Sequence, residues 1–90
     1  MRFALIAKDK PSSLEIRKAN RDAHVAYLKS TDAVEMAGPF LDDNGEMCGS
    51  LIILDLPDMQ AAQDWAASDP YKAADLFASV EISAWTKVIG

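Results

Sequence analysis

"GSLIILDLPD", residues 49–58, holds four consecutive apolar side chains, Leu51 to Leu54, between a glycine-serine pair and an aspartate. Successive residues of a strand point to opposite faces, so such a run predicts a strand that is buried on both faces. A second run of this kind, "FALIA" at residues 3–7, stops at the polar segment 8–11. We expect these two segments to lie at the centre of a sheet.

The rest of the chain divides into further strands and helices. Turn signals at Gly38-Pro39 and Asn44-Gly45 separate segments of strand-like composition. Strands are predicted over residues 2–8, 33–40, 47–56 and 79–89, helices from Pro11-Ser12 to about Ser30 and over 58–67, and a short helical turn over 70–77. The last strand alternates apolar and polar side chains, which is typical of a strand with one covered face.

The first helix has a start signal and an apolar stripe. Ser12 and Glu15 have the spacing of a capping box. At 100° per residue, one face collects the predicted core residues Ile16, Ala19, Ala23, Ala26 and Tyr27. A neighbouring row holds Arg17, Arg21, His24 and Leu28.

The order β-α-β-β-α-β predicts an α+β fold of the ferredoxin-like type, a four-stranded antiparallel sheet with both helices on one face. In that topology the first and third strands are central, and these two carry the unbroken apolar runs. Two helices cover only one face, yet the central strands are apolar on both. We therefore expect a homodimer in which the uncovered sheet faces pack together.

Composition limits the possible classes of protein. A chain of 90 residues is predicted to form a single domain, residues 1–90. Its net charge of −5 argues against nucleic acid as a partner. No segment approaches the ~20 apolar residues of a membrane helix, and no signal peptide is expected. The lone Cys48 has no disulfide partner, which favours a reduced, cytoplasmic protein.

Four short motifs resemble the YCII-related (YciI-like) domain family. They are "RDAHVAYL" in the first helix, "AGPF" at the end of the second strand, "GS" before the third strand and "SDPY" after the second helix. The resemblance covers nearly the whole chain, in order. It implies a subunit of the dimeric α+β barrel group. It also implies a proposed active site formed by a histidine and an aspartate, which correspond here to His24 and Asp69.

The resemblance further implies a range of reactions. One branch of the family looks like dehydrochlorinases that act on chlorinated hydroxyquinols, and relatives by fold include muconolactone isomerase and small monooxygenases. His24 is the only histidine, and imidazole exchanges protons near neutral pH. Asp69 precedes a proline, which suits a helix N-cap. We expect one carboxylate oxygen to cap the turn and the other to orient His24.

Other residues are candidates for binding a small ligand. Arg17 and Arg21 share the row of His24 and would attract an anionic substrate, although solvated surface charge is the alternative for both. The further candidates are Gly38, where a ligand or backbone could come close, and Pro39, Ser50 and Tyr71. The alternatives are that Gly38-Pro39 shapes the strand end, that Ser50 packs or bonds to the backbone, and that Tyr71 belongs to the core. The sequence predicts no metal site and no cofactor.

The leading hypothesis is an enzyme in which His24 acts as general acid and base and Asp69 orients it. Elimination, isomerisation or a related lyase step on a small anionic or phenolic molecule is the expected reaction class. Two alternatives stay open: a ligand-binding or accessory homodimer without chemistry, and a cofactor-free oxygenase.

Overall fold

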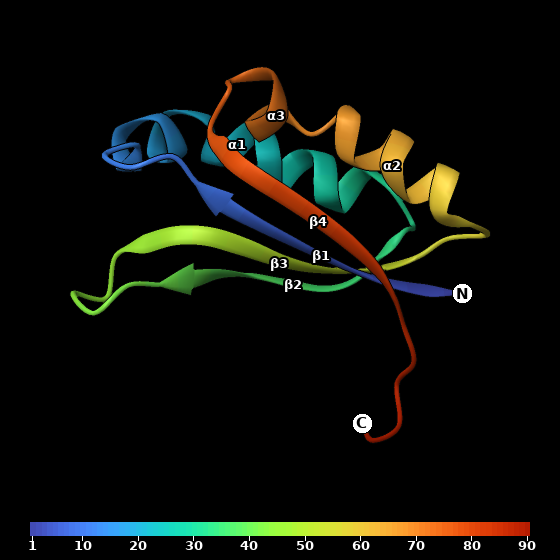
Figure 1. Cartoon of the computed structure of the whole chain (residues 1–90). Coiled ribbons are helices and arrows are strands. Elements are labelled where there is room, and N and C mark those ends of the chain that lie inside the picture. Colours follow the sequence, from blue (N-terminus) through green and yellow to red (C-terminus); the bar gives the residue numbers. More distant parts are fainter.

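The computed structural model describes all 90 residues as an antiparallel sheet with its helices on one face (Figure 1). The elements are β1 (Arg2–Asp9), α1 (Leu14–Ser30), β2 (Val34–Leu41), β3 (Met47–Asp55), α2 (Met59–Ala67), α3 (Pro70–Ala73) and β4 (Phe77–Trp85). The strand order is β2-β3-β1-β4. This confirms the ferredoxin-like arrangement, with the two apolar strands at the centre and the alternating strands at the edges.

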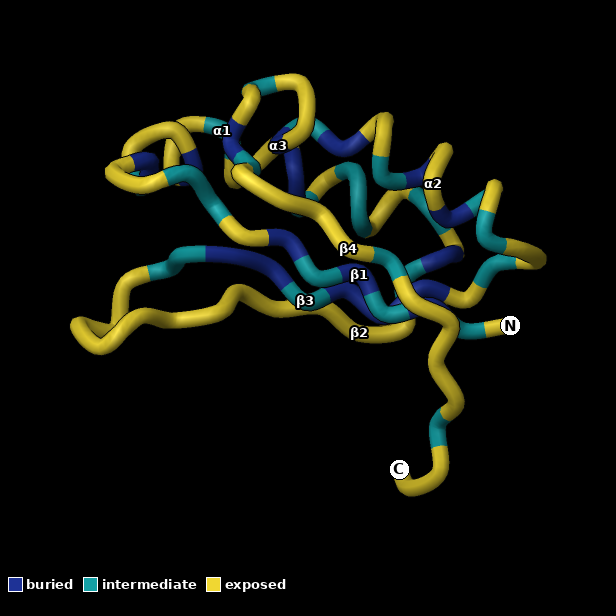
Figure 2. The backbone as a smooth tube through the Cα atoms, viewed as in Figure 1, coloured by how far each residue is buried: buried dark blue, intermediate teal, exposed yellow.

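The core lies between the two central strands and the helices, and Figure 2 shows stretches of buried residues, in dark blue, on β1 and β3. β1 pairs with β3 from Arg2↔Asp55 to Lys8↔Gly49. Because strand side chains alternate, one face of β1 supplies Phe3, Leu5 and Ala7, all at most 2% exposed. Ile52 and Leu54 of β3, Ala62 and Trp65 of α2, and Ala33, which precedes β2, complete this buried cluster.

The start of α1 differs from the expected capping box. Ser12 has a φ of +57°, in the left-handed region, and the N-cap is Ser13. The Ser13 side chain makes no cap hydrogen bond, and its Oγ donates instead to the carbonyl oxygen of Pro11 at 3.3 Å. The predicted pairing of Ser12 with Glu15 is therefore wrong, because the left-handed residue shifts the helix start by one position.

α1 also turns a different face inward. The predicted core stripe is largely outside: Ile16 is 40% exposed, and Ala19, Ala23 and Ala26 are exposed. The buried residues of the helix are Arg17 and His24. Alanine is a good helix former on a surface, and each buried polar side chain binds a carboxylate of its own. The neighbouring row, with these two paired polar side chains, thus faces inward in place of the apolar stripe.

β4 begins and ends earlier than the predicted strand 79–89. It pairs with β1 from Asp9↔Phe77 to Arg2↔Trp85. β1 begins at Arg2, so the chain beyond Trp85 has no residue of β1 to pair with. Residues 86–90 extend away from the sheet on the side opposite the helices (Figure 1), with Val88 87% and Ile89 91% exposed.

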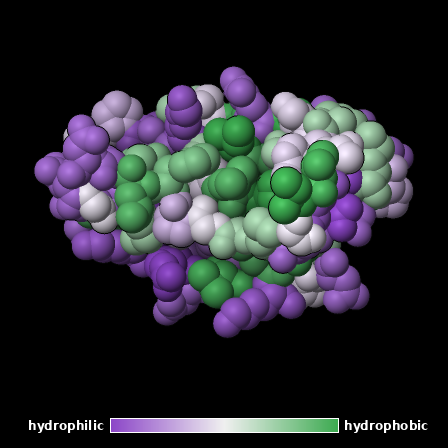
Figure 3. Space-filling model, turned by 90° about the horizontal axis from the view of Figure 1, so that it is seen from below, coloured by the Kyte–Doolittle hydropathy of each residue, from purple (hydrophilic) through white to green (hydrophobic).

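The sheet face turned away from the helices, which we call the free face, is rich in apolar side chains. The register and the alternation assign to it Ala4, Ile6, Met36, Phe40, Leu51, Ile53 and Trp85. Figure 3 shows hydrophobic surface gathered at the middle of this side of the molecule.

None of the helices is both long enough and apolar enough to cross a bilayer.

Candidate active site

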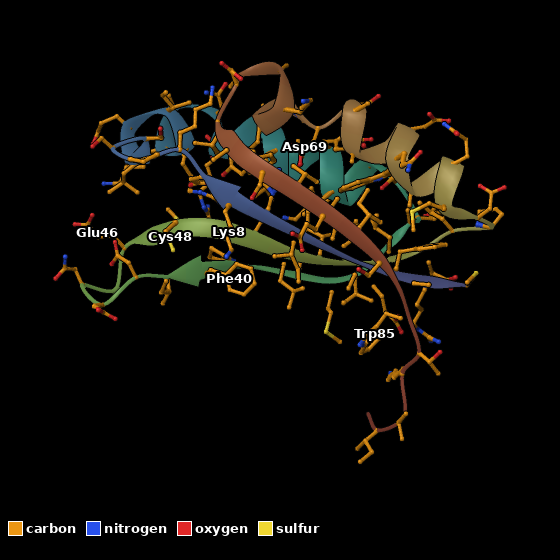
Figure 4. The ribbon with its side chains drawn as sticks, in the orientation of Figure 1. Lys8, Phe40, Glu46, Cys48, Asp69 and Trp85 are labelled. Carbon is orange, nitrogen blue, oxygen red and sulfur yellow. The ribbon has the colours of Figure 1, made fainter.

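The structure brings His24 and Asp69 into contact from elements 45 residues apart. His24 Nδ1 lies 2.8 Å from Asp69 Oδ1, and the two residues are 7% and 2% exposed. Figure 4 marks Asp69 between α3 and α2, where the view overlaps the ribbon of α1. The proline after Asp69 keeps that residue extended, which lets α3 begin at Pro70.

Asp69 uses one oxygen for two tasks. Its Oδ1 also accepts the backbone N–H of Tyr71 at 2.9 Å, which caps α3. The expected division, with one oxygen for the cap and the other for the imidazole, is therefore wrong. Because the cap fixes Oδ1, the short helix α3 determines where the acceptor for His24 lies.

This contact assigns the His24 tautomer. An ionised carboxylate only accepts hydrogen bonds, so a neutral ring carries its proton on Nδ1 and a lone pair on Nε2. Nε2 has no hydrogen-bond partner in the chain, and no buried side-chain nitrogen or oxygen lacks a partner. Nε2 is therefore accessible from outside. That is the state in which a histidine accepts a proton from a bound molecule.

Tyr71 packs directly on the histidine. The two rings are stacked, with centroids 3.9 Å apart and planes 13° apart, and the Arg17 guanidinium carbon lies 4.7 Å from the Tyr71 centroid. Burial raises the pKa of the Tyr71 phenol, and the charges of Arg17 and Arg21 offset only part of that rise. The phenol is thus a neutral group at physiological pH.

A cavity of about 120 Å³ lies between α1 and the strands β2 and β3. Every predicted site residue except Asp69 lines the cavity. Asp69 is not among the lining residues, and it contacts the cavity residue His24 through Nδ1. The lining residues are Arg17, Arg21, His24, Val25, Leu28, Ala37, Gly38, Pro39, Met47, Ser50, Ile52 and Tyr71. This volume is on the same order as the ~150 Å³ cavity that holds benzene in another protein, so the site is on the scale of a small molecule.

The two arginines of the cavity are in different electrostatic states. Arg17 is 2% exposed and forms a two-point ion pair with Asp9, with Nε–Oδ2 at 2.7 Å and Nη2–Oδ1 at 2.9 Å. Burial lowers the pKa of the Arg17 guanidinium, but the hydrogen bond and charge of Asp9 outweigh burial and raise it overall. Arg21 is exposed and forms no ion pair. Its charge is the one left for an anionic ligand.

Asp9 is a site residue that the sequence reasoning missed. The alternation of β1 contains the missing signal, since Phe3, Leu5, Ala7 and Asp9 all point toward the helices. An inward carboxylate at the end of a buried strand requires a cation or hydrogen-bond donors. Arg17, in the first turn of the next helix, is that cation.

The close approach of a ligand or backbone that we expect at Gly38 is found at another glycine, Gly49. A Cβ at Gly38 would meet nothing within 4 Å, so no backbone comes close there, although the residue lines the cavity. A Cβ at Gly49 would lie 2.5 Å from the carbonyl oxygen of Ala7. The close approach that requires glycine is thus at Gly49, between the central strands.

A larger hollow of about 280 Å³ lies at the start of α1, beside Asp9, Asp42 and Glu46. It contains no histidine, and the only cationic residue among those lining it is Lys10. We place the candidate site in the smaller cavity, because that is where a proton-accepting ring, an unpaired arginine and hydroxyl groups meet.

Comparison with solved structures defines the class first. The crystal structure of an antibiotic biosynthesis monooxygenase matches with a TM-score of 0.60 and 13% sequence identity, over 98% of both chains. The structure of Rv0793 from Mycobacterium tuberculosis matches with a TM-score of 0.61 and 14% sequence identity, over the full length of both chains. Identities this low show the fold alone. The chain is thus an α+β protein of ferredoxin-like topology, similar to proteins of the α+β barrel class.

Closer matches then identify the family. The chain belongs to the YCII-related domain family, whose model matches residues 1–86. It is 38% identical to an uncharacterised protein of Haemophilus influenzae and 35% identical to protein YciI of Escherichia coli, each over 98% of this chain and 99% of the relative.

One similar structure carries a reaction in its description. The 5-chloro-2-hydroxyhydroquinone dehydrochlorinase (TftG) of Burkholderia phenoliruptrix, in complex with 2,5-dihydroxybenzoquinone, matches with a TM-score of 0.88. The identity is 32%, over 96% of this chain and 94% of the dehydrochlorinase.

Proposed function

We propose that this protein is an enzyme that catalyses an elimination on a small hydroxylated ring, with His24 as general acid and base and Asp69 as its orienting partner. The observation that carries the proposal is the 2.8 Å contact from His24 Nδ1 to Asp69 Oδ1. It leaves Nε2 as the proton acceptor and sets a carboxylate where it stabilises the protonated ring.

The cavity supports the substrate class. Its volume of about 120 Å³ suits one ring, and the stacked His24 and Tyr71 rings give it a flat aromatic border. Arg21 has no carboxylate partner, so it favours a substrate that carries negative charge. A chlorinated hydroxyhydroquinone, the substrate type of the similar dehydrochlorinase, meets these requirements when one hydroxyl group is ionised.

The chemistry is balanced without an external oxidant or reductant. In the first step a hydroxyl proton moves to the chlorine-bearing carbon, which leaves a ketone in the ring. In the second step His24 accepts a second hydroxyl proton. The electron pair of that O–H bond passes through the ring and breaks the C–Cl bond, so chloride leaves and a hydroxyquinone remains. The ring is oxidised by the loss of chloride.

The test is chloride release from 5-chloro-2-hydroxyhydroquinone by the purified protein, measured with and without His24→Gln. General acid–base catalysis contributes ~10²–10⁴-fold, so we expect kcat to fall by that factor in the variant. Activity that survives the substitution unchanged would remove His24 from the mechanism. Binding of 2,5-dihydroxybenzoquinone without turnover by the wild-type protein would favour the alternative of a binding protein, and oxygen uptake with the same ring would favour an oxygenase.

We also propose that the free face packs against the same face of a second copy. The face is apolar at its centre and carries both Lys8 and Glu81, so a two-fold copy is able to set opposite charges together. Met36, 53% exposed on this face, tests the interface, and Ile16, 40% exposed on α1, is the matched control. Met36→Asp should give monomers in light scattering, whereas Ile16→Asp should leave dimers. A cytoplasmic location stays a prediction.

A further inference from the structure

The hydrogen bonds of Arg17 leave the Ser50 hydroxyl group free to donate a hydrogen bond. A guanidinium has five N–H groups. Two of those on Arg17 bind Asp9, and another, on Nη2, donates to Ser50 Oγ at 3.0 Å. Arg17 only donates, so Ser50 must accept in this contact. Its own hydroxyl proton remains available, and no acceptor within the chain receives it.

The surroundings direct that proton to the cavity. Ser50 is 3% exposed, and it lines the same cavity as His24. Its oxygen accepts from a cation, and such a bond polarises the hydroxyl group and strengthens it as a donor. Arg17 itself is held at two points by a buried carboxylate whose side chain is 5% exposed. The direction of the hydroxyl group is therefore set by a chain of buried contacts.

We propose that Ser50 donates a hydrogen bond to the substrate oxygen on which negative charge develops as His24 removes the proton, and that Arg17 and Asp9 are positioning residues for this donor. This inference rests on the proposed function. It divides the roles of the two arginines: Arg21 attracts the anion from solution, whereas Arg17, already neutralised by Asp9, fixes the donor. The contribution of Ser50 is made in the transition state, because the charge on that oxygen appears only there.

Kinetics distinguish these roles. Removing one preorganised donor costs about 10²–10³-fold in kcat, so Ser50→Ala should lower kcat by roughly 100-fold and change KM less than about 3-fold. Arg21→Gln should instead raise KM and weaken its dependence on ionic strength. Ser79→Ala, the same change at an exposed serine of β4, is the matched control and should behave as wild type.

The positioning role has its own measurement. Asp9→Asn should lose kcat as Ser50→Ala does, and adding Ser50→Ala to it should lower kcat no more than about 3-fold further, because both changes disable one donor. Full multiplication of the two losses would show that Asp9 acts elsewhere and would overturn that part. If Asp9→Asn fails to fold, Arg17→Lys replaces it, since lysine keeps the charge but not the fork that binds Asp9 and Ser50 together.

Failure of this inference differs from failure of the proposed function. Chloride release by wild type with an unchanged kcat in Ser50→Ala overturns the donor role alone, as does a loss confined to KM. No chloride release by wild type overturns the function. In that case the donor role is overturned with it, because the charge that Ser50 is proposed to meet develops only during the reaction.

Discussion

Replacing Asp69 by asparagine or by alanine separates its two tasks, because a single oxygen performs both. Oδ1 accepts from His24 Nδ1 at 2.8 Å and from the Tyr71 N–H at 2.9 Å. Asparagine keeps a carbonyl oxygen, and it ranks with aspartate as an N-cap. Turning its amide group around would set N–H groups against both donors, so the carbonyl oxygen stays in place and the His24 tautomer is retained.

The magnitudes follow from these contacts. Asp69→Ala loses the cap, about 1 kcal/mol, and leaves a buried imidazole N–H without an acceptor, about 1–3 kcal/mol. We expect the free energy of unfolding to fall by about 2–4 kcal/mol, a large share of the roughly 5–13 kcal/mol of a chain this size. Asp69→Asn exchanges charge-assisted hydrogen bonds for neutral ones, which costs about 1–2 kcal/mol where charge develops, or about 5–30-fold in kcat.

Urea unfolding, followed by tryptophan fluorescence, measures the free energy of unfolding of each variant. Chloride release by the same samples measures kcat. Trp65, which is 6% exposed, reports the core. Asparagine should keep most of the stability and lose activity, whereas alanine should lose both. Equal instability of the two variants would refute the assignment of the cap to a carbonyl-type oxygen. Wild-type kcat in Asp69→Asn would refute a role for the carboxylate charge.

Three further outcomes are expected. Gly49→Ala should lower the free energy of unfolding by about 1–3 kcal/mol, since its Cβ has no room between the central strands, whereas Gly38→Ala, with open space, should stay within about 0.5 kcal/mol. Burial raises the pKa of Tyr71 above its unfolded value of about 10. The stability that comes from its neutral phenol is therefore present below about pH 10 and is lost as the pH rises through the folded pKa. In urea titrations from pH 8 to 11, the free energy of unfolding should decline less steeply for Tyr71→Phe than for wild type. Asp9→Asn leaves Arg17 buried and unpaired, and urea unfolding should show a loss of about 3–5 kcal/mol that a joint replacement of both by apolar residues largely avoids.

The sheet was predictable from the sequence because strand alternation depends only on local pattern. Unbroken runs marked β1 and β3 as central, and the alternating segments fell at the edges. The inward face of α1 was not predictable by the same reasoning. Periodicity shows where apolar residues gather, but three of those on α1 are alanines, which bury little area. The contacts of Arg17 with Asp9 and of His24 with Asp69 determine which face of α1 turns inward, and both aspartates lie outside the helix.

The candidate site was predictable in its residues but not in its connections. The motif resemblance named His24 and Asp69, and the row along α1 named Arg17 and Arg21 together. Whether a carboxylate shares one oxygen between two donors depends on distances of a few tenths of an ångström. The different states of the two arginines depend on Asp9, whose importance follows only once β1 is known to direct it inward.

The separation of 45 residues between His24 and Asp69 also determines when the site comes into existence during synthesis. The helix that carries the imidazole is translated before its carboxylate partner. Lys10 bonds to the carbonyl oxygen of Leu76 at 2.9 Å, so even the loop before that helix awaits the last quarter of the chain. A polypeptide that ends before Asp69 therefore lacks the contact on which the proposed site depends.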